Sequence, residues 1–164
     1  MTAPSVHEEP KATGTPEYVY AEDLMPDQAW DLGSHTLTEE EIVSFARQWD
    51  PHFFHIDPER AAAEGHFGGL IASGLQTLGV YQRLWADQLS GHLRLIAGAG
   101  LDDVRFRRPV RPGDRLTGRS AVTSVDLEPA RRRGRVGLRG VLHNQHGEPV
   151  LGLASSVYVE MRVA

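Results

Sequence analysis

Apolar side chains recur every three or four positions from Ile42 onward, which is the period of one face of an α-helix. Residues 38–41 (TEEE) precede them with the spacing of a capping box, in which the threonine and the last glutamate cap each other's amides. Pro51 disfavours helical geometry at the residue before it. The pattern therefore predicts a helix of about three turns up to Asp50, with an apolar face of Ile42, Phe45, Ala46 and Trp49.

Two further helices are indicated before residue 91. Asp57-Pro58 combines an N-cap acid with proline at the first helical position, so a short helix should span residues 59–64 and stop at Gly65. After a partly apolar link, Ser73 is expected to cap a longer helix over residues 73–90, closed near Gly91. Its apolar face should be mostly buried; that face comprises Leu75, Leu78, Tyr81, Leu84, Trp85 and Leu89.

The second half of the chain alternates apolar and polar residues, which is the period of a half-buried β-strand. We expect strands over residues 102–108, 115–125, 135–142 and 151–161, with turns at residues 111–114 and 146–149. A short β-prone run at residues 17–20 marks the expected start of folded structure. Helices followed by an antiparallel meander predict an α+β domain, in which a buried helix packs against a curved sheet.

Length and composition indicate one domain over residues 17–164. Residues 1–16 are rich in Thr, Pro, Glu and Ala and lack the apolar core of a signal peptide, so a disordered tail on a cytoplasmic protein is expected. The net charge of −5 argues against a nucleic-acid surface. The absence of cysteine excludes disulfides and thiolate catalysis, and no apolar run approaches the roughly 18 residues of a membrane span.

Asp50 and His55 are the first candidates for chemistry. They lie five residues apart with Pro51 and Pro58 on either side, so they cannot share one continuous helix. A loop can still bring a carboxylate and an imidazole to one point, where they would hold a water molecule and exchange protons with it. An aspartate at a helix end and a histidine in an aromatic loop are also common structural residues, so the pattern leaves both interpretations open.

Ser73-Gly74 is the second candidate. The first amides of a helix have no partner inside the helix and lie at the positive end of its dipole. Glycine lets a ligand approach the backbone closely. The Gly74 amide is therefore a candidate donor to a carbonyl oxygen that gains negative charge, and an ordinary N-cap is the alternative.

Two other clusters have weaker interpretations. His52, His55, His66, Asp50 and Asp57 contain ligand types for zinc, iron or manganese. No third firm ligand appears, because Asp57 is explained as an N-cap, so no metal site is predicted. The arginine-rich run at residues 131–135 is expected to be a solvated hairpin tip, with a phosphate contact as the alternative.

From Tyr18 to Glu160 the chain resembles the MaoC-like acyl dehydratases, which include the (R)-specific enoyl-CoA hydratases. Three segments in family order carry the resemblance: residues 45–58 (FARQWDPHFFHIDP), 67–74 (FGGLIASG) and 106–114 (FRRPVRPGD). The resemblance implies a hot-dog fold, in which a curved antiparallel sheet wraps a long central helix. It also implies a homodimer with continuous sheets.

The implied reaction is reversible syn hydration of a trans-2-enoyl thioester to an (R)-3-hydroxyacyl thioester, without a cofactor. Coenzyme A or an acyl carrier protein would carry the substrate. By position, Asp50 and His55 match the family's catalytic pair, with His55 as the base, and Gly74 matches the glycine whose amide binds the thioester carbonyl. Residues assigned to substrate binding are Ser73, Phe53, Phe54, Trp49, Phe67 and Gly69.

The chain departs from the family pattern at three positions. Trp49 replaces a glycine, His52 replaces an asparagine, and Ser73 replaces a histidine. His52 is interpreted as a substitution within the motif rather than as a third participant. A hot-dog module that only binds acyl thioesters, and a hot-dog thioesterase, are the alternative functions.

Overall fold

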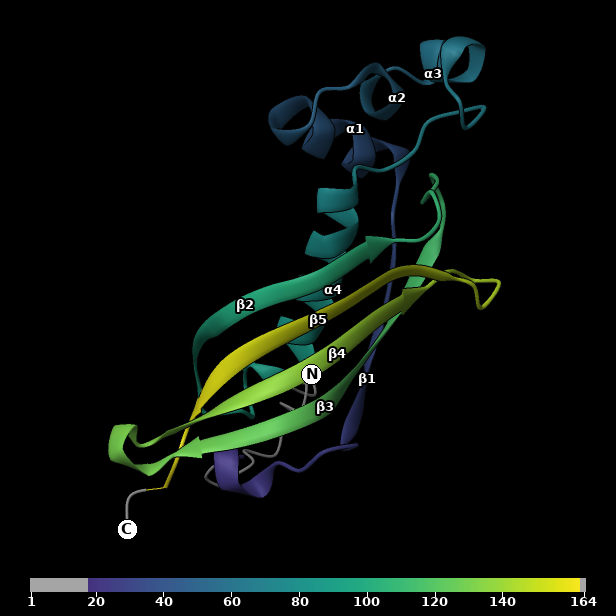
Figure 1. Cartoon of the computed structure of the whole chain (residues 1–164). Coiled ribbons are helices and arrows are strands. Elements are labelled where there is room, and N and C mark those ends of the chain that lie inside the picture. The colour runs from purple at the N-terminus through teal and green to yellow at the C-terminus, as the bar shows by residue number, and fades with distance from the viewer. Residues whose placement is uncertain (1–17, 163–164) are drawn as a thin grey trace, which may run out of the picture.

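A five-stranded antiparallel sheet curves around the longest helix (Figure 1). The computed structural model describes residues 18–162. The elements, in chain order, are the 3-10 helix η1 (Ala21–Asp23), β1 (Ala29–Thr36), α1 (Glu39–Trp49), α2 (Phe53–Ile56), α3 (Pro58–Glu64), α4 (Gly74–Leu89), β2 (Leu95–Phe106), β3 (Arg115–Glu128), the 3-10 helix η2 (Pro129–Arg131), β4 (Arg133–His143) and β5 (Pro149–Glu160). The predicted α+β class is confirmed.

The strand order β1-β3-β4-β5-β2 differs from the predicted meander at one point. β3, β4 and β5 are consecutive neighbours, as expected, but β2 pairs with β5 and not with β3. The turn at residues 111–114 exists: the Asp114 N–H donates to the Arg111 carbonyl at 3.1 Å, and Gly113 has a φ of +86°. It belongs to a crossover between distant strands, so its assignment as the turn between paired strands was wrong.

Two strand segments were not predicted. β1 carries Asp31 and Gly33 where its register against β3 shifts, and Gly33 has a φ of +78°, so its sequence lacks regular alternation. β2 begins at Leu95 rather than at residue 102, because its Gly- and Ala-rich first half is ordered by pairing with β5. Tyr18 to Tyr20 form no strand; Val19 makes an isolated bridge to Leu93. The tail predicted for residues 1–16 lies outside the described residues.

The predicted helix caps are confirmed. The Glu41 N–H donates to Thr38 Oγ1 at 3.2 Å, and the Thr38 N–H donates to Glu41 Oε2 at 2.8 Å, which completes the capping box. The Arg60 N–H donates to Asp57 Oδ1 at 3.0 Å. These caps fix the ends of α1 and α3, which gather with α2 beyond the N-terminus of α4 (Figure 1).

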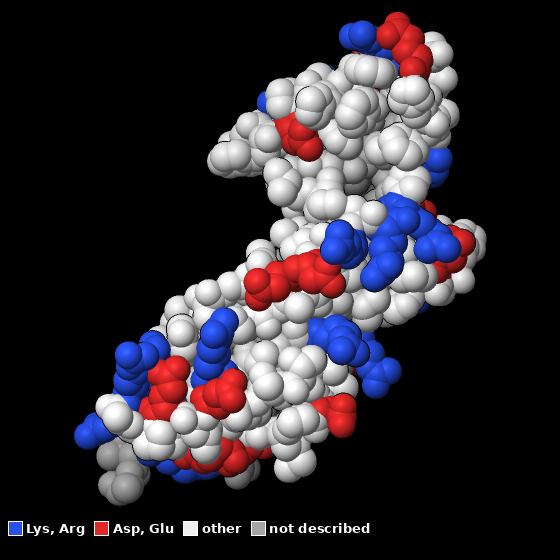
Figure 2. Space-filling view, in the orientation of Figure 1, with Lys and Arg blue, Asp and Glu red and all other residues white. Residues whose placement is uncertain are grey.

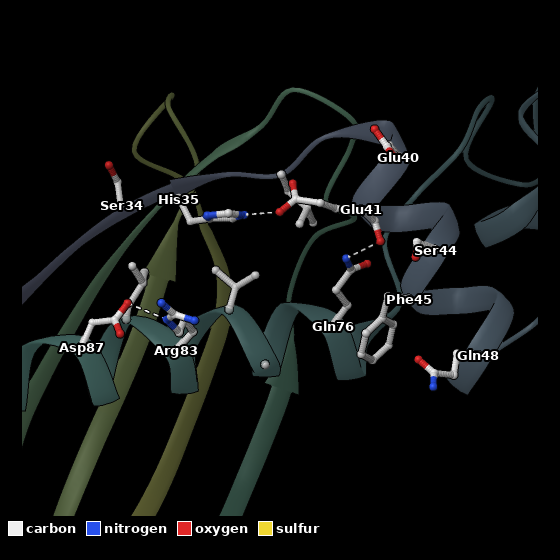
Figure 3. A pocket seen from close by; sticks show the side chains of 14 residues that line it. Ser34, His35, Glu40, Glu41, Ser44, Phe45, Gln48, Gln76, Arg83 and Asp87 are labelled. Carbon is white, nitrogen blue, oxygen red and sulfur yellow. Dashed lines mark hydrogen bonds and ion pairs between the residues drawn. The ribbon is translucent and has the colours of Figure 1, made fainter. Parts of the chain in front are cut away.

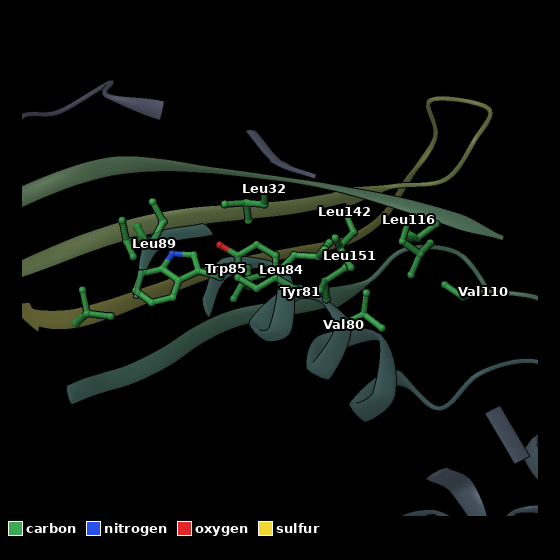
Figure 4. Close-up of a cluster of buried hydrophobic side chains, with 14 of the residues drawn as sticks. Leu32, Val80, Tyr81, Leu84, Trp85, Leu89, Val110, Leu116, Leu142 and Leu151 are labelled. Atoms are coloured by element: carbon green, nitrogen blue, oxygen red, sulfur yellow. The ribbon is translucent and has the colours of Figure 1, made fainter. Parts of the chain in front are cut away.

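The core lies between α4 and the concave face of the sheet (Figure 4). Tyr81, Leu84 and Trp85 of α4 are buried there, as predicted. Leu75 is 55% exposed, so its assignment to the buried face of this helix was wrong. Leu75 is the second residue of α4, and this end of the helix is near α1, α2 and α3 (Figure 1). Trp49, on the predicted apolar face of α1, is 63% exposed.

Arg131 and Arg132 of the arginine-rich run lie at the tip between β3 and β4, whereas residues 133–135 begin β4. Arg131 Nη1 and Arg133 Nε both donate to Glu128 Oε2, at 3.2 and 2.9 Å, and Arg133 also lies over the Tyr158 ring. The hairpin tip is confirmed. Its guanidinium groups are partly neutralised by Glu128, which does not favour a phosphate contact.

Candidate active site

Three helix ends bring Asp50 and His55 together. Asp50 is the C-cap of α1, and His55 lies in α2, a short helix where the sequence predicted only a loop. His55 Nε2 lies 3.6 Å from Asp50 Oδ2. This separation allows both groups to contact one water molecule, which is the arrangement that acid–base chemistry on water needs.

Backbone contacts fix the tautomer of His55. Its Nδ1 lies 2.7 Å from the Ile71 carbonyl oxygen, which can only accept a hydrogen bond, so Nδ1 carries the proton. In the neutral ring Nε2 then has a free lone pair, and it faces Asp50. The His55 side chain is 7% exposed, so the orientation of this potential base is held by its surroundings.

Ser73 joins the pair from the start of α4. Its hydroxyl donates to Asp50 Oδ2 at 2.7 Å and accepts the Leu75 N–H at 3.2 Å. Ser73 is fully buried. The same side chain therefore caps α4 and holds one oxygen of the candidate catalytic carboxylate.

His52 approaches the other oxygen of Asp50. Its Nε2 lies 3.4 Å from Asp50 Oδ1. The ring is stacked on Phe54 with 5.3 Å between centroids, and Phe54 meets the His55 ring edge-on at 4.5 Å. The interpretation of His52 as a plain substitution missed this contact, because spacing along the chain does not report which way a loop side chain turns.

Gly74 is the first residue of α4 and borders a cavity of about 270 Å³ that also contains His55, Phe67 and Thr77 in its lining. A Cβ at Gly74 would lie 2.8 Å from the Phe106 ring, which lines the same cavity. Only a glycine leaves this close approach free. Sequence reasoning missed Phe106 and Thr77, and the one signal that could have found them is their place in or near the matching segments.

The remaining predicted binding residues are not in the lining of this cavity. Trp49 is largely exposed, and Phe53 packs under the Arg60 guanidinium at 4.4 Å. Phe54 contacts His52 and His55, as described above. Gly69 lies beside the Arg111 side chain, at 3.6 Å from an added Cβ. Of the predicted substrate-binding residues, Phe67 is the one that lines the cavity together with His55 and Gly74.

Positive charge gathers over the carboxyl end of β2 (Figure 2). Arg107 and Arg108 line the 270 Å³ cavity together with His55. Arg108 pairs with Glu148 at 3.5 Å and donates to the Pro149 carbonyl. Within the described part of the chain, the Arg107 side chain has no ion-pair partner. A free guanidinium is thus available to an anionic part of a ligand in this cavity.

A larger cavity lies elsewhere (Figure 3). It measures about 740 Å³ and is formed by β1, α1 and α4, with Gln76 and the paired side chains His35 and Glu41 in its wall. Gln76 Nε2 donates to the Glu41 carbonyl at 2.9 Å. Neither Asp50 nor His55 reaches this cavity, so size alone does not identify the candidate site.

Within residues 18–162, no three His, Asp or Glu side chains converge as metal ligands would. The exposed His66 and the N-cap Asp57 do not join Asp50. No helix in the same range is long and apolar enough to cross a membrane.

Comparison with known proteins defines the class. The family model described as MaoC like domain matches residues 24–141, so the chain belongs to the MaoC-like dehydratase family. It is 32% identical over 121 residues to the uncharacterized protein YdeM of Bacillus subtilis, which covers 74% of this chain and 82% of YdeM. It is 40% identical over 93 residues to 3-hydroxyacyl-thioester dehydratase Z of Mycobacterium tuberculosis, which covers 56% of this chain and 61% of that dehydratase.

The solved structures agree with this class. A crystal structure of the MaoC-like dehydratase from Rhodospirillum rubrum matches with a TM-score of 0.79 and 33% identity, covering 89% of this chain and 99% of the other. The predicted family and hot-dog fold are therefore confirmed, with α4 as the central helix inside the curved sheet.

Proposed function

We propose that the protein catalyses the reversible syn hydration of a trans-2-enoyl-CoA to an (R)-3-hydroxyacyl-CoA. The observation that carries the proposal is the placement of His55 Nε2 at 3.6 Å from Asp50 Oδ2, with His55 and Gly74, the first residue of α4, lining the same cavity. The name of the mycobacterial relative, a 3-hydroxyacyl-thioester dehydratase, supports the same substrate class.

In the hydration direction, His55 Nε2 takes a proton from water as the water oxygen attacks Cβ. Asp50, which carries a proton at the start of the cycle, delivers it to Cα on the same face, which gives syn addition. The Gly74 amide has no partner inside α4 and lies at the positive end of the helix dipole. It would stabilise the enolate-like oxygen of the thioester. Water and these side chains supply every group that the reaction needs, so no cofactor is proposed.

An apolar groove can receive the acyl chain. A cavity of about 540 Å³ lies between α4 and β2, with Tyr81, Trp85, Leu95 and Leu153 among its lining residues. Tyr81 lies seven residues after Gly74, which corresponds to roughly 10 Å along a helix. A chain that starts at the catalytic pair and follows α4 would enter this groove.

The test is loss of enoyl absorbance with purified protein and a panel of trans-2-enoyl-CoA substrates of graded length and branching. We expect hydration of at least one substrate, and a loss of on the order of 10²-fold or more in kcat for Asp50→Asn and His55→Gln. Full activity in these variants would refute the assigned roles. Free thiol released without hydration would indicate a thioesterase, and binding without turnover would indicate a binding module.

We also propose a homodimer joined through β2. This strand has one unpaired edge, and its Ile96 and Leu101 side chains are 48% and 54% exposed. An exposed apolar edge strand favours pairing with another strand. Light scattering should give twice the chain mass for the wild-type protein, and Leu101→Lys should shift the protein toward the monomer. A wild-type monomer at micromolar concentration would refute this interface.

A further inference from the structure

His52 is held beside Asp50 by the backbone as well as by its ring. The His52 N–H donates to the Asp50 carbonyl at 2.8 Å, and the His55 N–H donates to the His52 carbonyl at 2.9 Å. These two bonds place His52 between the catalytic candidates. Its Nε2 then reaches Asp50 Oδ1 at 3.4 Å, while Oδ2 faces Ser73 and His55.

The two imidazoles differ in their access to water. The His52 side chain is 67% exposed, whereas that of His55 is 7% exposed. Phe54 lies between them and supports the His52 ring by parallel stacking, with an interplanar angle of 6°. Stacking uses the ring face and leaves both ring nitrogens available. His52 therefore links a half-buried carboxylate to bulk solvent through an ionisable ring.

We propose that His52 is a proton-relay residue that returns the proton which Asp50 loses in each hydration. This inference rests on the proposed function. After one hydration, Asp50 has given a proton to Cα and His55 has gained one from water. Asp50 and His55 make no direct hydrogen bond at 3.6 Å, and the water molecule between them has been consumed by the addition, so no direct path returns the proton from His55 to Asp50. In its imidazolium form His52, whose Nε2 lies 3.4 Å from Asp50 Oδ1, passes the Nε2 proton to that oxygen and is protonated again by bulk water. His55 releases its extra proton through the cavity that it lines.

The protons balance over one turnover. One proton enters through His52 and one leaves from His55, so each turnover consumes only the water molecule that adds to the substrate. His52 touches no reacting atom in this scheme and acts through Asp50, so it is a positioning residue for the carboxylate as well as a relay. Within residues 18–162, the His52 ring contacts the Asp50 carboxylate and the rings of Phe54 and His55.

The experiment compares His52→Ala, His52→Asn and a control, His146→Ala, which removes an exposed histidine from the turn between β4 and β5. Hydration rates are measured with and without imidazole in the buffer. We expect kcat to fall about tenfold or more in both His52 variants, with KM nearly unchanged, and imidazole to restore kcat in His52→Ala, since a relay is a proton-transfer function that a small base can supply. His146→Ala should match the wild type.

Three outcomes overturn the relay. Unchanged kcat in His52→Ala excludes it, and so does a loss that imidazole does not restore, which would indicate a structural role. Full activity in His52→Asn would mean that Asp50 needs only a hydrogen-bond donor at this position. If the wild type hydrates no thioester while binding or cleaving one, the proposed function fails and the relay fails with it, which distinguishes that result from the other three.

Discussion

Ser73→Ala should cost more than the loss of a helix cap, because the Ser73 hydroxyl makes two hydrogen bonds of different kinds. It accepts the Leu75 N–H as the N-cap of α4, and it donates to the Asp50 carboxylate at 2.7 Å. Loss of a serine or threonine cap typically costs about 1 kcal/mol of folding free energy. A hydrogen bond to a charged group is worth about 1.5–3 kcal/mol.

The lower end of that range applies here. The Asp50 side chain is 23% exposed, so water replaces part of the lost bond. Adding about 1.5 kcal/mol for the bond to about 1 kcal/mol for the cap gives a total loss of about 2.5 kcal/mol. If the whole 1.5 kcal/mol also orients the carboxylate in the transition state, kcat should fall about tenfold.

Thr38→Ala is the matched control. Thr38 caps α1 and has no contact with Asp50, so this variant should lose about 1 kcal/mol and keep its kcat. Urea denaturation gives the stabilities, and hydration of the best enoyl-CoA gives kcat. Equal stability losses in the two variants, or an unchanged kcat in Ser73→Ala, would refute the reasoning that the Asp50 bond adds to the cap.

Three further predictions follow from single contacts. Gly74→Ala should lower hydration activity about tenfold or more, because its Cβ must displace the Phe106 ring. In the control Gly79→Ala the Cβ meets nothing within 4 Å, so this variant should gain about 0.5–1 kcal/mol of stability. Equal hydration activities in the two variants would contradict this reasoning. Arg107→Ala should raise KM for an enoyl-CoA more than for the matching N-acetylcysteamine thioester, which lacks phosphates; equal changes would exclude a phosphate contact. The hydrogen bond from the Thr38 N–H holds the pKa of Glu41 below its usual 4.5. The charged carboxylate therefore stabilises the fold at neutral pH, and this stability is lost as pH falls below about 4.5. Glu41→Gln should flatten this part of the curve of unfolding free energy against pH, measured by urea denaturation.

Elements with local signals were predicted well. The caps at Thr38, Asp57 and Ser73 depend on residues three or fewer positions apart, and each formed as expected. β1 and the first half of β2 were missed because their order depends on partners far along the chain. Ala29 pairs with Ala121, and Leu95 pairs with Val159. Hydrogen bonds to these distant strands order the two segments, so their own sequences carry no regular alternation of apolar and polar residues.

The same contrast between local signals and contacts distant along the chain applies to the candidate site. Residue types alone left the roles of Asp50 and His55 open, and resemblance to a family selected them. The bond from Ser73 to Asp50 joins positions 23 residues apart, and the bond from His55 to the Ile71 carbonyl joins positions 16 apart. Such contacts require the helices to be docked in space, so periodicity and spacing could not predict them.

The junction of α1, α2 and α4 also limits which residues can stand at position 73. The side chain there must accept the Leu75 N–H and donate to Asp50 at the same time, within a fully buried site. A hydroxyl does both, whereas an aspartate would cap α4 but place a second carboxylate against Asp50, and alanine would do neither. Stability of the helix start and orientation of the carboxylate are thus coupled through one hydroxyl group. A variant such as Ser73→Asp should therefore retain the cap of α4 and still lose hydration activity, which separates the two roles of this hydroxyl by experiment.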